Sequence, residues 1–201
     1  MTTITAKTAA EADIHRLPPR ERLLSVARDL FYRHGIRAVG VEAIAEAAGT
    51  NKMTLYRHFA SKDELVAEYL RCLAAEKAVI WDKLERDHPG DPAAQLKAWV
   101  QEAARNVADP TSRGCALANA AVELPEKDHP ARCVIEQCKQ GGREKLLALC
   151  RRANIKQPEL LADQLVMLLE GAFMCRQSIG NEGPACSFVR AGEALIDAHS
   201  K

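Results

Sequence analysis

Apolar residues recur at helical spacing in the first part of this chain. Between residues 41 and 48 they occupy positions i, i+3, i+4 and i+7 of one helical face, as Val41, Ile44, Ala45 and Ala48. Gly49 suits the left-handed backbone that follows a helix, and the side chain of Asn51 suits the cap of a new one. The pattern predicts a short helix, a turn of about three residues and a second helix.

The second helix is predicted to run from about Lys52 to Phe59. Leu55 and Phe59 form its apolar side, and the other side is polar without any carboxylate. A helix this short is marginal alone, so we expect it to pack on a helix over residues 19–34. The apolar residues of that preceding helix are Leu23, Leu24, Ala27, Leu30 and Phe31. A three-helix unit of this kind can present one helix to the major groove of DNA.

Several residues of this region stand at one fixed spacing, namely Ile44, Ala45, Ala48, Gly49, Thr54, Leu55, Tyr56, His58, Phe59, Lys62 and Leu65. They match in register the pattern I-A-x-x-A-G-V-S-x-x-T-L-Y-x-H-F-x-x-K-x-x-L. The region therefore resembles the DNA-binding domain of the TetR family of transcriptional regulators. Thr50, Asn51 and Met53 depart from the pattern. The departure at Met53 bears on which operator is read, because a side chain there can touch a thymine methyl group.

The resemblance implies which side chains meet DNA. In the family, residues matching Tyr56, His58 and Lys62 contact phosphates, and those matching residues 52–54 approach base edges. Hydroxyl, imidazole and ammonium groups all donate to phosphate oxygens, which agrees with this division. The predicted DNA-binding residues are Asn51, Lys52, Met53, Thr54, Tyr56, Arg57, His58 and Lys62. Without the motif, the same residues would be interpreted as a half-buried ring within a solvated polar face.

Charge is distributed unevenly along the chain. The 201 residues carry 28 Lys and Arg against 27 Asp and Glu, a net charge of +1. Residues 1–60 hold 9 Lys and Arg against 6 Asp and Glu, or +3, which leaves −2 for the remainder. The positive end is therefore the end with the predicted DNA-binding helix. A hydrophobic content of 47% with only 4% aromatic residues favours a helical protein with a buried core.

Seven cysteines are scattered along the chain, and no Cys-x-x-Cys occurs. An odd, scattered set argues against a disulfide framework or a zinc ribbon. There is no apolar leader and no run of about eighteen apolar residues, so we expect a cytoplasmic protein that is neither secreted nor inserted in a membrane. No phosphate loop, zinc-protease motif or nucleophile elbow is present. We therefore expect no enzyme, no cofactor and no metal site.

Helical patterns continue through the rest of the chain. A long helix is predicted from the capping residue Ser61 to about Arg86, followed by helices over about 92–109, 115–124, 130–153, 158–179 and 188 onward. The predicted organisation is a flexible N-terminal arm over 1–17, a helix-turn-helix DNA-binding domain over 18–64, and a ligand-binding and dimerisation domain over 65–201.

The helix over 158–179 is apolar on more than one face. Its apolar residues are Leu160, Leu161, Leu165, Val166, Met167, Leu168, Leu169, Ala172, Phe173 and Met174. A helix of this kind is either central or shared with a partner. The last two helices resemble the pair that forms a four-helix dimer interface in TetR-like regulators. We expect a homodimer through these helices, because a two-fold protein binds a palindromic operator in double-stranded DNA with two recognition helices.

Candidate ligand contacts come from composition, because the C-terminal half resembles the family only in its helical plan. They are Trp99, Ala103, Cys115, Leu117, Asn119, Phe173 and Cys175. Each is more often a core residue than a ligand contact. Cys115 lies near a helix start beside Arg113, an environment that favours a thiolate, so electrophile or oxidant sensing stays open against a buried inert thiol. His129 and Cys133 share a helix face, but two ligands do not make a metal site.

The sequence predicts an all-α fold, in which an N-terminal three-helix helix-turn-helix domain is joined by a long helix to an α-helical ligand-binding and dimerisation domain. The function that fits is a ligand-responsive DNA-binding transcriptional regulator, chiefly a repressor released by a small-molecule effector, with activation left open. The alternative is a helical ligand- or electrophile-binding protein without sequence-specific DNA binding.

Overall fold

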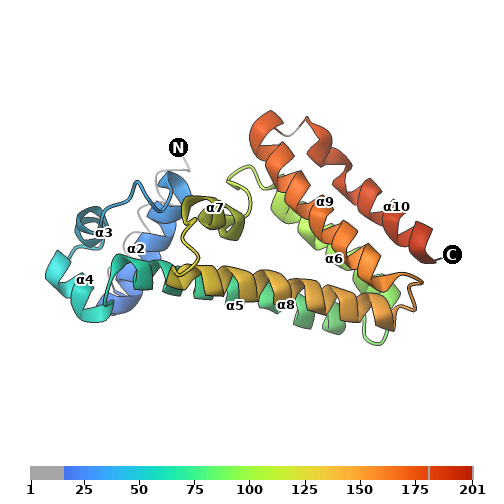
Figure 1. Cartoon of the computed structure of the whole chain (residues 1–201), viewed down its shortest axis with the longest axis horizontal. Coiled ribbons are helices and arrows are strands. Elements are labelled where there is room, and N and C mark those ends of the chain that lie inside the picture. The colour runs from blue at the N-terminus through green and yellow to red at the C-terminus, as the bar shows by residue number, and fades with distance from the viewer. Residues whose placement is uncertain (1–15, 181, 201) are drawn as a thin grey trace. The chain divides into compact units, whose positions relative to one another are not determined.

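The computed structural model describes residues 16–180 and 182–200, and within them the fold is entirely helical. The helices are α2 (Pro19–His34), α3 (Val41–Ala47), α4 (Lys52–His58), α5 (Lys62–Asp87), α6 (Pro92–Ala108), α7 (Ala116–Glu123), α8 (Pro130–Arg152), α9 (Pro158–Ile179), the 3-10 helix η1 (Pro184–Ser187) and α10 (Phe188–Ser200) (Figure 1). The predicted all-α fold is confirmed. The arm predicted over 1–17 lies, except for its last two residues, outside the described part of the chain. None of the described helices combines the length and apolar character needed to cross a membrane.

Local capping signals set several helix starts. At the start of α4, the Asn51 side chain accepts the backbone N–H of Thr54 at 2.9 Å. At the start of α6, the Asp91 side chain accepts the backbone N–H of Ala94 at 3.0 Å. Gly49, in the turn before α4, lies at φ 61°. These features were readable from the sequence because each depends on residues only a few positions apart.

Two compact units divide the chain, Met1–Leu73 with Leu117–Ile135 and Ala74–Ala116 with Glu136–Lys201. The first contains α2, α3, α4, nearly all of α7 and the first parts of α5 and α8. The second contains α6, α9, η1, α10 and the remainders of α5 and α8. The domain boundary between residues 64 and 65 stays a prediction.

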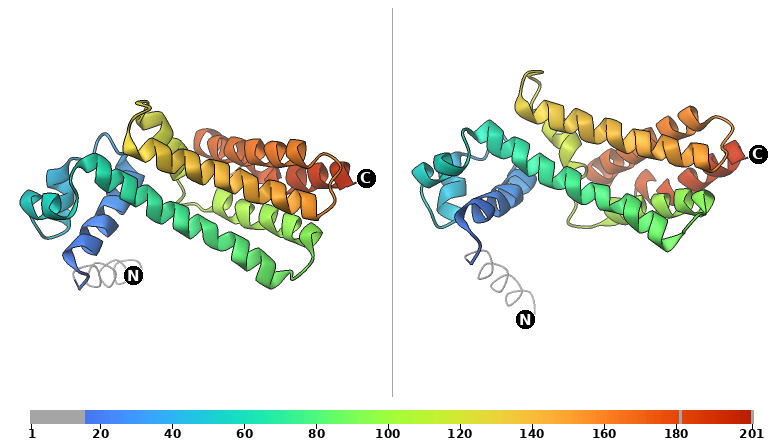
Figure 2. Two further views of the ribbon diagram at one scale, coloured as in Figure 1. Left: turned by 60° about the horizontal axis from the view of Figure 1, so that its bottom comes forward. Right: turned by 90° about the horizontal axis from the view of Figure 1, so that it is seen from below.

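The first unit is built on α2, α3 and α4, which pack against one another (Figure 2). Leu23, Ile44 and Leu55, one from each helix, have no exposed surface. Removing an aliphatic side chain of this size from water stabilises a fold by about 1.5–3 kcal/mol. The start of α5 completes the core, where the rings of Phe31 and Tyr69 lie 5.7 Å apart. This core holds α4 with its apolar side inward.

Helix α7 is attached to the loop that follows α2. The Glu123 carboxylate accepts the backbone N–H of Arg37 at 2.9 Å, and the Arg37 guanidinium pairs with Glu126 at 3.2 Å. Gly35 ends α2 at φ 88°, where a Cβ would lie 3.0 Å from the Glu123 carboxylate. Glycine is needed here for both the backbone conformation and the close approach. The sequence analysis did not predict that α7 belongs to the helix-turn-helix unit.

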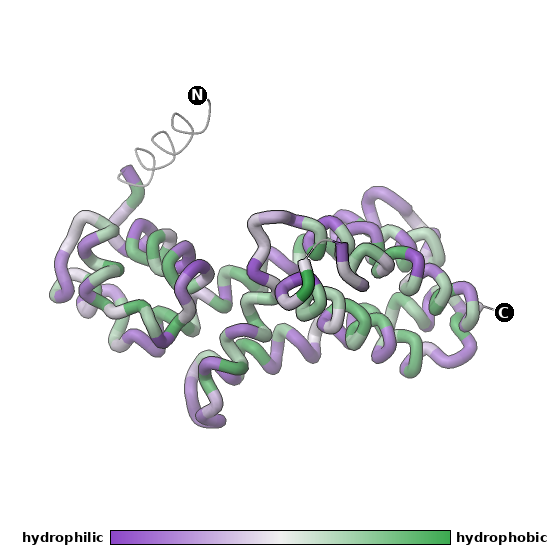
Figure 3. Tube along the Cα trace, turned by 90° about the horizontal axis from the view of Figure 1, so that it is seen from above, coloured by the Kyte–Doolittle hydropathy of each residue, from purple (hydrophilic) through white to green (hydrophobic). Residues whose placement is uncertain are grey.

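The second unit packs α6, α9 and α10 against one another (Figure 1). Leu96 of α6 and Leu161 and Leu165 of α9 are fully buried. At Gly192 of α10, a Cβ would lie 2.9 Å from Val100 of α6, so glycine allows these two helices to approach closely. Hydrophobic and hydrophilic stretches alternate along the trace (Figure 3), as expected for helices that bury only part of their surface.

Candidate nucleic-acid interface

Helix α4 carries most of the predicted DNA-binding residues on an accessible side. Those exposed are Asn51, Lys52, Met53, Tyr56 and Arg57, and those half-buried are Thr54 and His58. The other side is anchored, since Leu55 and Phe59 lie in the core. One accessible surface thus holds two cations, a phenol hydroxyl and an apolar methionine side chain. Such a set suits both phosphate contact and base contact.

Lys52 pairs with a carboxylate of the neighbouring helix. Its Nζ lies 2.6 Å from Oε1 of Glu42 on α3 and 5.9 Å from the centre of the Tyr56 ring. The hydrogen bond raises the pKa of Lys52 above its ordinary value and lowers the pKa of Glu42 below its own. Lys52 therefore stays charged, but DNA must compete with Glu42 for it. Sequence reasoning missed Glu42, because the pair forms across the turn between α3 and α4.

Replacing Glu42 with glutamine is expected to strengthen DNA binding about two- to fivefold, because an exposed ion pair no longer has to break before Lys52 meets the DNA. The measurement is a fluorescence-anisotropy titration of a palindromic duplex recovered by selection. Glu46→Gln makes the same charge change at an exposed position one turn further along α3 and serves as the control. Equal gains for the two variants would contradict direct competition for Lys52.

Lys62 is placed differently from the residues of α4. Its Nζ donates to the Ile36 carbonyl oxygen at 2.6 Å, and burial lowers the pKa of Lys62 below its ordinary value. The hydrogen bond ties the start of α5 to the loop after α2. An ammonium group has three donors, so this bond leaves donors for a phosphate. The phosphate contact of Lys62 stays a prediction.

The predicted ligand contacts are divided between the two units. Leu117 and Asn119 belong to the first. Those in the second are Trp99, Ala103, Cys115, Phe173 and Cys175. Trp99 and Ala103 are part of the hydrophobic core of the second unit, and Phe173 and Cys175 pack against it. The structure therefore gathers four of the seven in one core, and their contact with a ligand stays a prediction.

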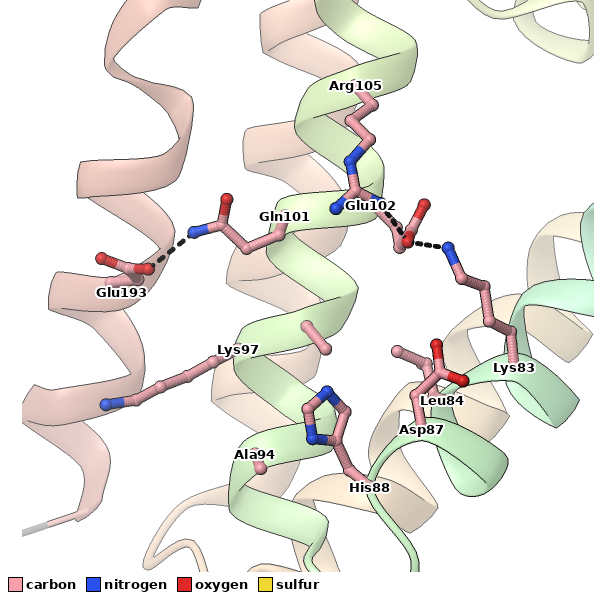
Figure 4. A pocket seen from close by; sticks show the side chains of 11 residues that line it. Lys83, Leu84, Asp87, His88, Ala94, Lys97, Gln101, Glu102, Arg105 and Glu193 are labelled. Carbon is pink, nitrogen blue, oxygen red and sulfur yellow. Dashed lines mark hydrogen bonds and ion pairs between the residues drawn. The ribbon is translucent and has the colours of Figure 1, made fainter.

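A pocket of about 460 Å³ lies in the second unit, lined by the end of α5, by α6 and by α10 (Figure 4). Several of its polar side chains pair with one another. Glu102 binds both Lys83 and Arg105, and the Gln101 amide donates to Glu193 at 2.9 Å. None of the predicted ligand contacts lines this pocket. Sequence periodicity gave no sign of it, because its polar residues resemble any solvated helix surface.

Comparison with known proteins decides the family. The family model described as bacterial regulatory proteins, tetR family, matches residues 23–69, from α2 into α5. The crystal structure of a putative TetR transcriptional regulator from Streptomyces avermitilis is 32% identical in sequence, with a TM-score of 0.79, over 91% of this chain and 98% of that one. The chain belongs to the TetR family.

Other TetR-family matches agree. A regulator from Streptomyces coelicolor has a TM-score of 0.85 at 27% identity, over 91% of this chain and 96% of that one. The transcriptional repressor KstR2 of Mycobacterium tuberculosis is 48% identical over 52 residues. That match spans only 26% of the length of either protein. The chain is thus a TetR-family DNA-binding transcriptional regulator and not an enzyme, and what it regulates is a separate question.

Proposed function

We propose that the chain is a homodimeric repressor that binds a palindromic operator and is released from it by a small-molecule effector. The observation that carries the proposal is α4 itself, a capped helix anchored by Leu55 and Phe59 with its cations exposed. Repression is the proposed sense of action, because KstR2, one of the curated relatives that share the DNA-binding region, is named a repressor. The seven free cysteines fit a reducing compartment, so the cytoplasm is the proposed location.

On the operator, the residues of α4 divide between base and phosphate contacts. Lys52 is assigned to guanine O6 and N7, the acceptors that a cation meets in the major groove. Met53 is 75% exposed, and its apolar side chain is assigned to a thymine methyl group. Tyr56, His58 and Lys62 are assigned to phosphates, which fix the register of the helix on the duplex.

The salt dependence of binding tests the phosphate contacts. Lys62→Gln removes an ammonium but keeps a donor for the Ile36 carbonyl oxygen, and we expect the log–log salt slope to become shallower by about 0.9. Tyr56→Phe removes a neutral donor, so we expect an affinity loss of about tenfold with an unchanged slope. A Lys62→Gln protein that keeps both its thermal stability and its full salt slope would contradict the phosphate contact of Lys62. A Tyr56→Phe protein that binds DNA with full affinity would contradict the phosphate contact of Tyr56.

Dimerisation is assigned to α9 with α10. Leu160, Met167 and Met174 are exposed on α9 at intervals of seven residues, with the exposed Gly171 between the methionines. Residues seven apart lie on the same face of a helix. The opposite stripe of α9 is buried in the core of its own unit. On α10, Ala194 and Ala198 are exposed. Small residues let helices of two protomers approach closely, and the apolar stripe supplies surface to bury.

Effector release couples two sites, the operator-binding surface and the effector site. An effector that weakens operator binding by some factor must itself be bound more weakly by the same factor when DNA is present. Within the first unit, α7 is tied through Glu123 and Arg37 to the loop between α2 and α3. We propose that a movement of α7 caused by the effector reaches the recognition helix through this hydrogen bond, since the bond connects α7 directly with the DNA-binding helices.

A further inference from the structure

Two lysines converge on one buried cysteine in the second unit. Cys115 is 5% exposed, and its Sγ accepts hydrogen bonds from Lys139 Nζ at 3.3 Å and from Lys77 Nζ at 3.6 Å. Lys139 also binds the carboxylate of Glu170 on α9. The four side chains come from α5, the loop before α7, α8 and α9. This cluster is used neither by DNA binding nor by the proposed dimer surface.

Lys139 is held in its charged form beside the sulfur. Although burial lowers the pKa of Lys139, the nearby Cys115 and the hydrogen bond with Glu170 raise it more, so that the pKa of Lys139 lies above its ordinary value. Ammonium groups directed at a sulfur favour the thiolate, which is the nucleophilic form. Glu170 fixes Lys139 in place as well as balancing part of its charge.

Two other thiols lie at least partly inside the second unit. Burial raises the pKa of Cys150 to about 11. Burial also raises the pKa of Cys138, although Lys77 and Lys139 lie near it too. Cys133 and Cys186 are exposed. Within the same chain, Cys150 therefore serves as the comparison for a buried thiol of low reactivity, and Cys133 and Cys186 serve as the comparison for accessible thiols.

The loop that carries Cys115 is held by α9. The Arg176 side chain donates to the Asp109 carbonyl oxygen at 3.3 Å, and the Gln177 amide donates to the Arg113 carbonyl oxygen. Gly114 lies at φ 78°, and a Cβ there would come within 2.6 Å of the Gln177 amide. Only glycine suits this backbone next to Gln177. The sulfur is thereby fixed against the two ammonium groups and does not lie on a freely moving loop.

We propose that Cys115, with Lys77 and Lys139, is a covalent binding site for small α,β-unsaturated carbonyl compounds. The thiolate forms a bond from Sγ to the β-carbon, and the electron pair of the carbon–carbon double bond moves to give an enolate. A lysine ammonium donates its proton to the enolate, and the lysine regains a proton from water. The product is a thioether, and no oxidant, reductant or leaving group is required.

The same cluster explains why this class of compound suits the site. The ammonium groups that favour the thiolate also hydrogen-bond the carbonyl oxygen, on which negative charge develops during addition. Burial of the sulfur selects small reagents over bulky ones. An alkyl group added at a position that is 5% exposed has to displace its surroundings, because protein interiors have few voids.

The adduct has a direct route to the helix-turn-helix unit. Cys115 immediately precedes α7, and from Leu117 onward that helix belongs to the first unit. Displacement of the loop at Cys115 is therefore expected to shift α7, whose Glu123 accepts a hydrogen bond from the backbone N–H of Arg37. This step, from adduct to loss of DNA binding, rests on the proposed function. The covalent reaction at Cys115 does not.

Labelling with less than one equivalent of methyl vinyl ketone, followed by peptide mass mapping of the full chain, tests the reaction. Cys115 is expected to react about tenfold faster than the exposed Cys133 and Cys186, because for a small reagent the two ammonium groups at its sulfur outweigh its lower exposure. A polyethylene-glycol maleimide is expected to show the reverse order. Preferential labelling of Cys133 and Cys186 by methyl vinyl ketone would overturn the proposal.

Lysine variants test the cause of the reactivity. Lys139→Met is expected to slow labelling of Cys115 about tenfold, whereas Lys139→Arg, which keeps the charge, is expected to stay within about threefold of the original chain. Lys77→Met is the second variant, since Lys77 lies farther from the sulfur and its loss disturbs fewer contacts. Thermal melting confirms that each variant folds. Equal rates in the Met and Arg variants of Lys139 would overturn the role of its charge.

A DNA titration after labelling tests the consequence. Modification at Cys115 is expected to lower affinity for a selected palindrome about tenfold or more, the usual scale of coupling between two sites, and Cys115→Ser is expected to be insensitive to the reagent. A labelled chain that binds DNA unchanged would overturn the regulatory part of the inference. If the untreated chain binds no specific DNA, the proposed function fails, and the labelling order still decides whether the covalent site exists.

Discussion

Replacing Lys52 and Arg57 together with alanine is expected to weaken operator binding by about 100-fold or more, because each lost contact to a base or phosphate costs about 1–3 kcal/mol. Both side chains are exposed on α4, and neither belongs to the core that Leu55 and Phe59 anchor. The fold should therefore persist, with thermal stability within a few degrees of the original chain. The variant and the original chain are each titrated with the selected palindrome and with a scrambled duplex. A loss confined to the palindrome indicates lost base contacts, whereas an equal loss on both duplexes indicates lost charge.

The control for this experiment is the double variant Arg86→Ala with Lys97→Ala. These two cations are exposed at the end of α5 and on α6, and their removal changes the net charge of the chain by the same amount. Operator affinity of the control is expected to stay within about twofold of the original chain at physiological salt, where distant surface charges are screened. Similar losses in the two double variants would mean that α4 is not the reading helix.

Placing glutamate at both Met167 and Met174 is expected to convert the proposed dimer to monomers. The two residues are 65% and 61% exposed on α9, and in a two-fold interface each substitution brings like charges from two protomers together without partners. Loss of the second recognition helix should reduce operator affinity by about 100- to 10,000-fold. In a dimer, binding of one half-site holds the second recognition helix near the other half-site, and a monomer lacks this high effective concentration. Analytical ultracentrifugation measures the dimer, and the DNA titration measures the consequence.

Val79→Glu is the matched control for the dimer surface. Val79 is an apolar residue of α5 that is 60% exposed. Its replacement also exchanges an exposed apolar side chain for a carboxylate, but away from the proposed interface. The control protein is expected to remain dimeric and to bind the operator normally. A double methionine variant that sediments as a dimer would contradict the assignment of the interface to α9.

Helix starts and the exposed side of α4 were predictable because they depend on residues close in sequence. Asn51 caps α4 through Thr54, three positions away, and Asp91 caps α6 through Ala94 in the same manner. The burial of Leu55 followed from helical periodicity alone. The motif then identified the family, although the contacts of α4 with DNA stay predictions.

Partners that meet through tertiary packing were not predictable. Glu42 pairs with Lys52 across a turn, and Lys77 and Lys139 reach Cys115 from positions 38 and 24 residues away. Sequence reasoning looked for a cation beside Cys115 and found Arg113, whereas the cations that hydrogen-bond the sulfur come from α5 and α8. No single-sequence pattern encodes which helices will lie beside a given loop.

The ligand contacts show a second limit. Trp99 and Ala103 were chosen for their residue type, and they lie in the core of the second unit. The paired charges of Glu102 and Lys83 line a pocket that composition gave no reason to select. Apolar residues on an amphipathic helix serve a core and a ligand site equally well, so periodicity does not separate the two.

Selection of the purified chain against a random pool of duplex DNA, sequenced after several rounds at near-physiological salt, tests the central claim most directly. A dimeric regulator that reads DNA through α4 will enrich one palindrome, with half-sites separated by about one helical turn or a multiple of it. Selection repeated with the Lys52 and Arg57 double variant will then lose that palindrome. Failure of the original chain to enrich any sequence, with all retained DNA released at modest salt, would contradict sequence-specific binding.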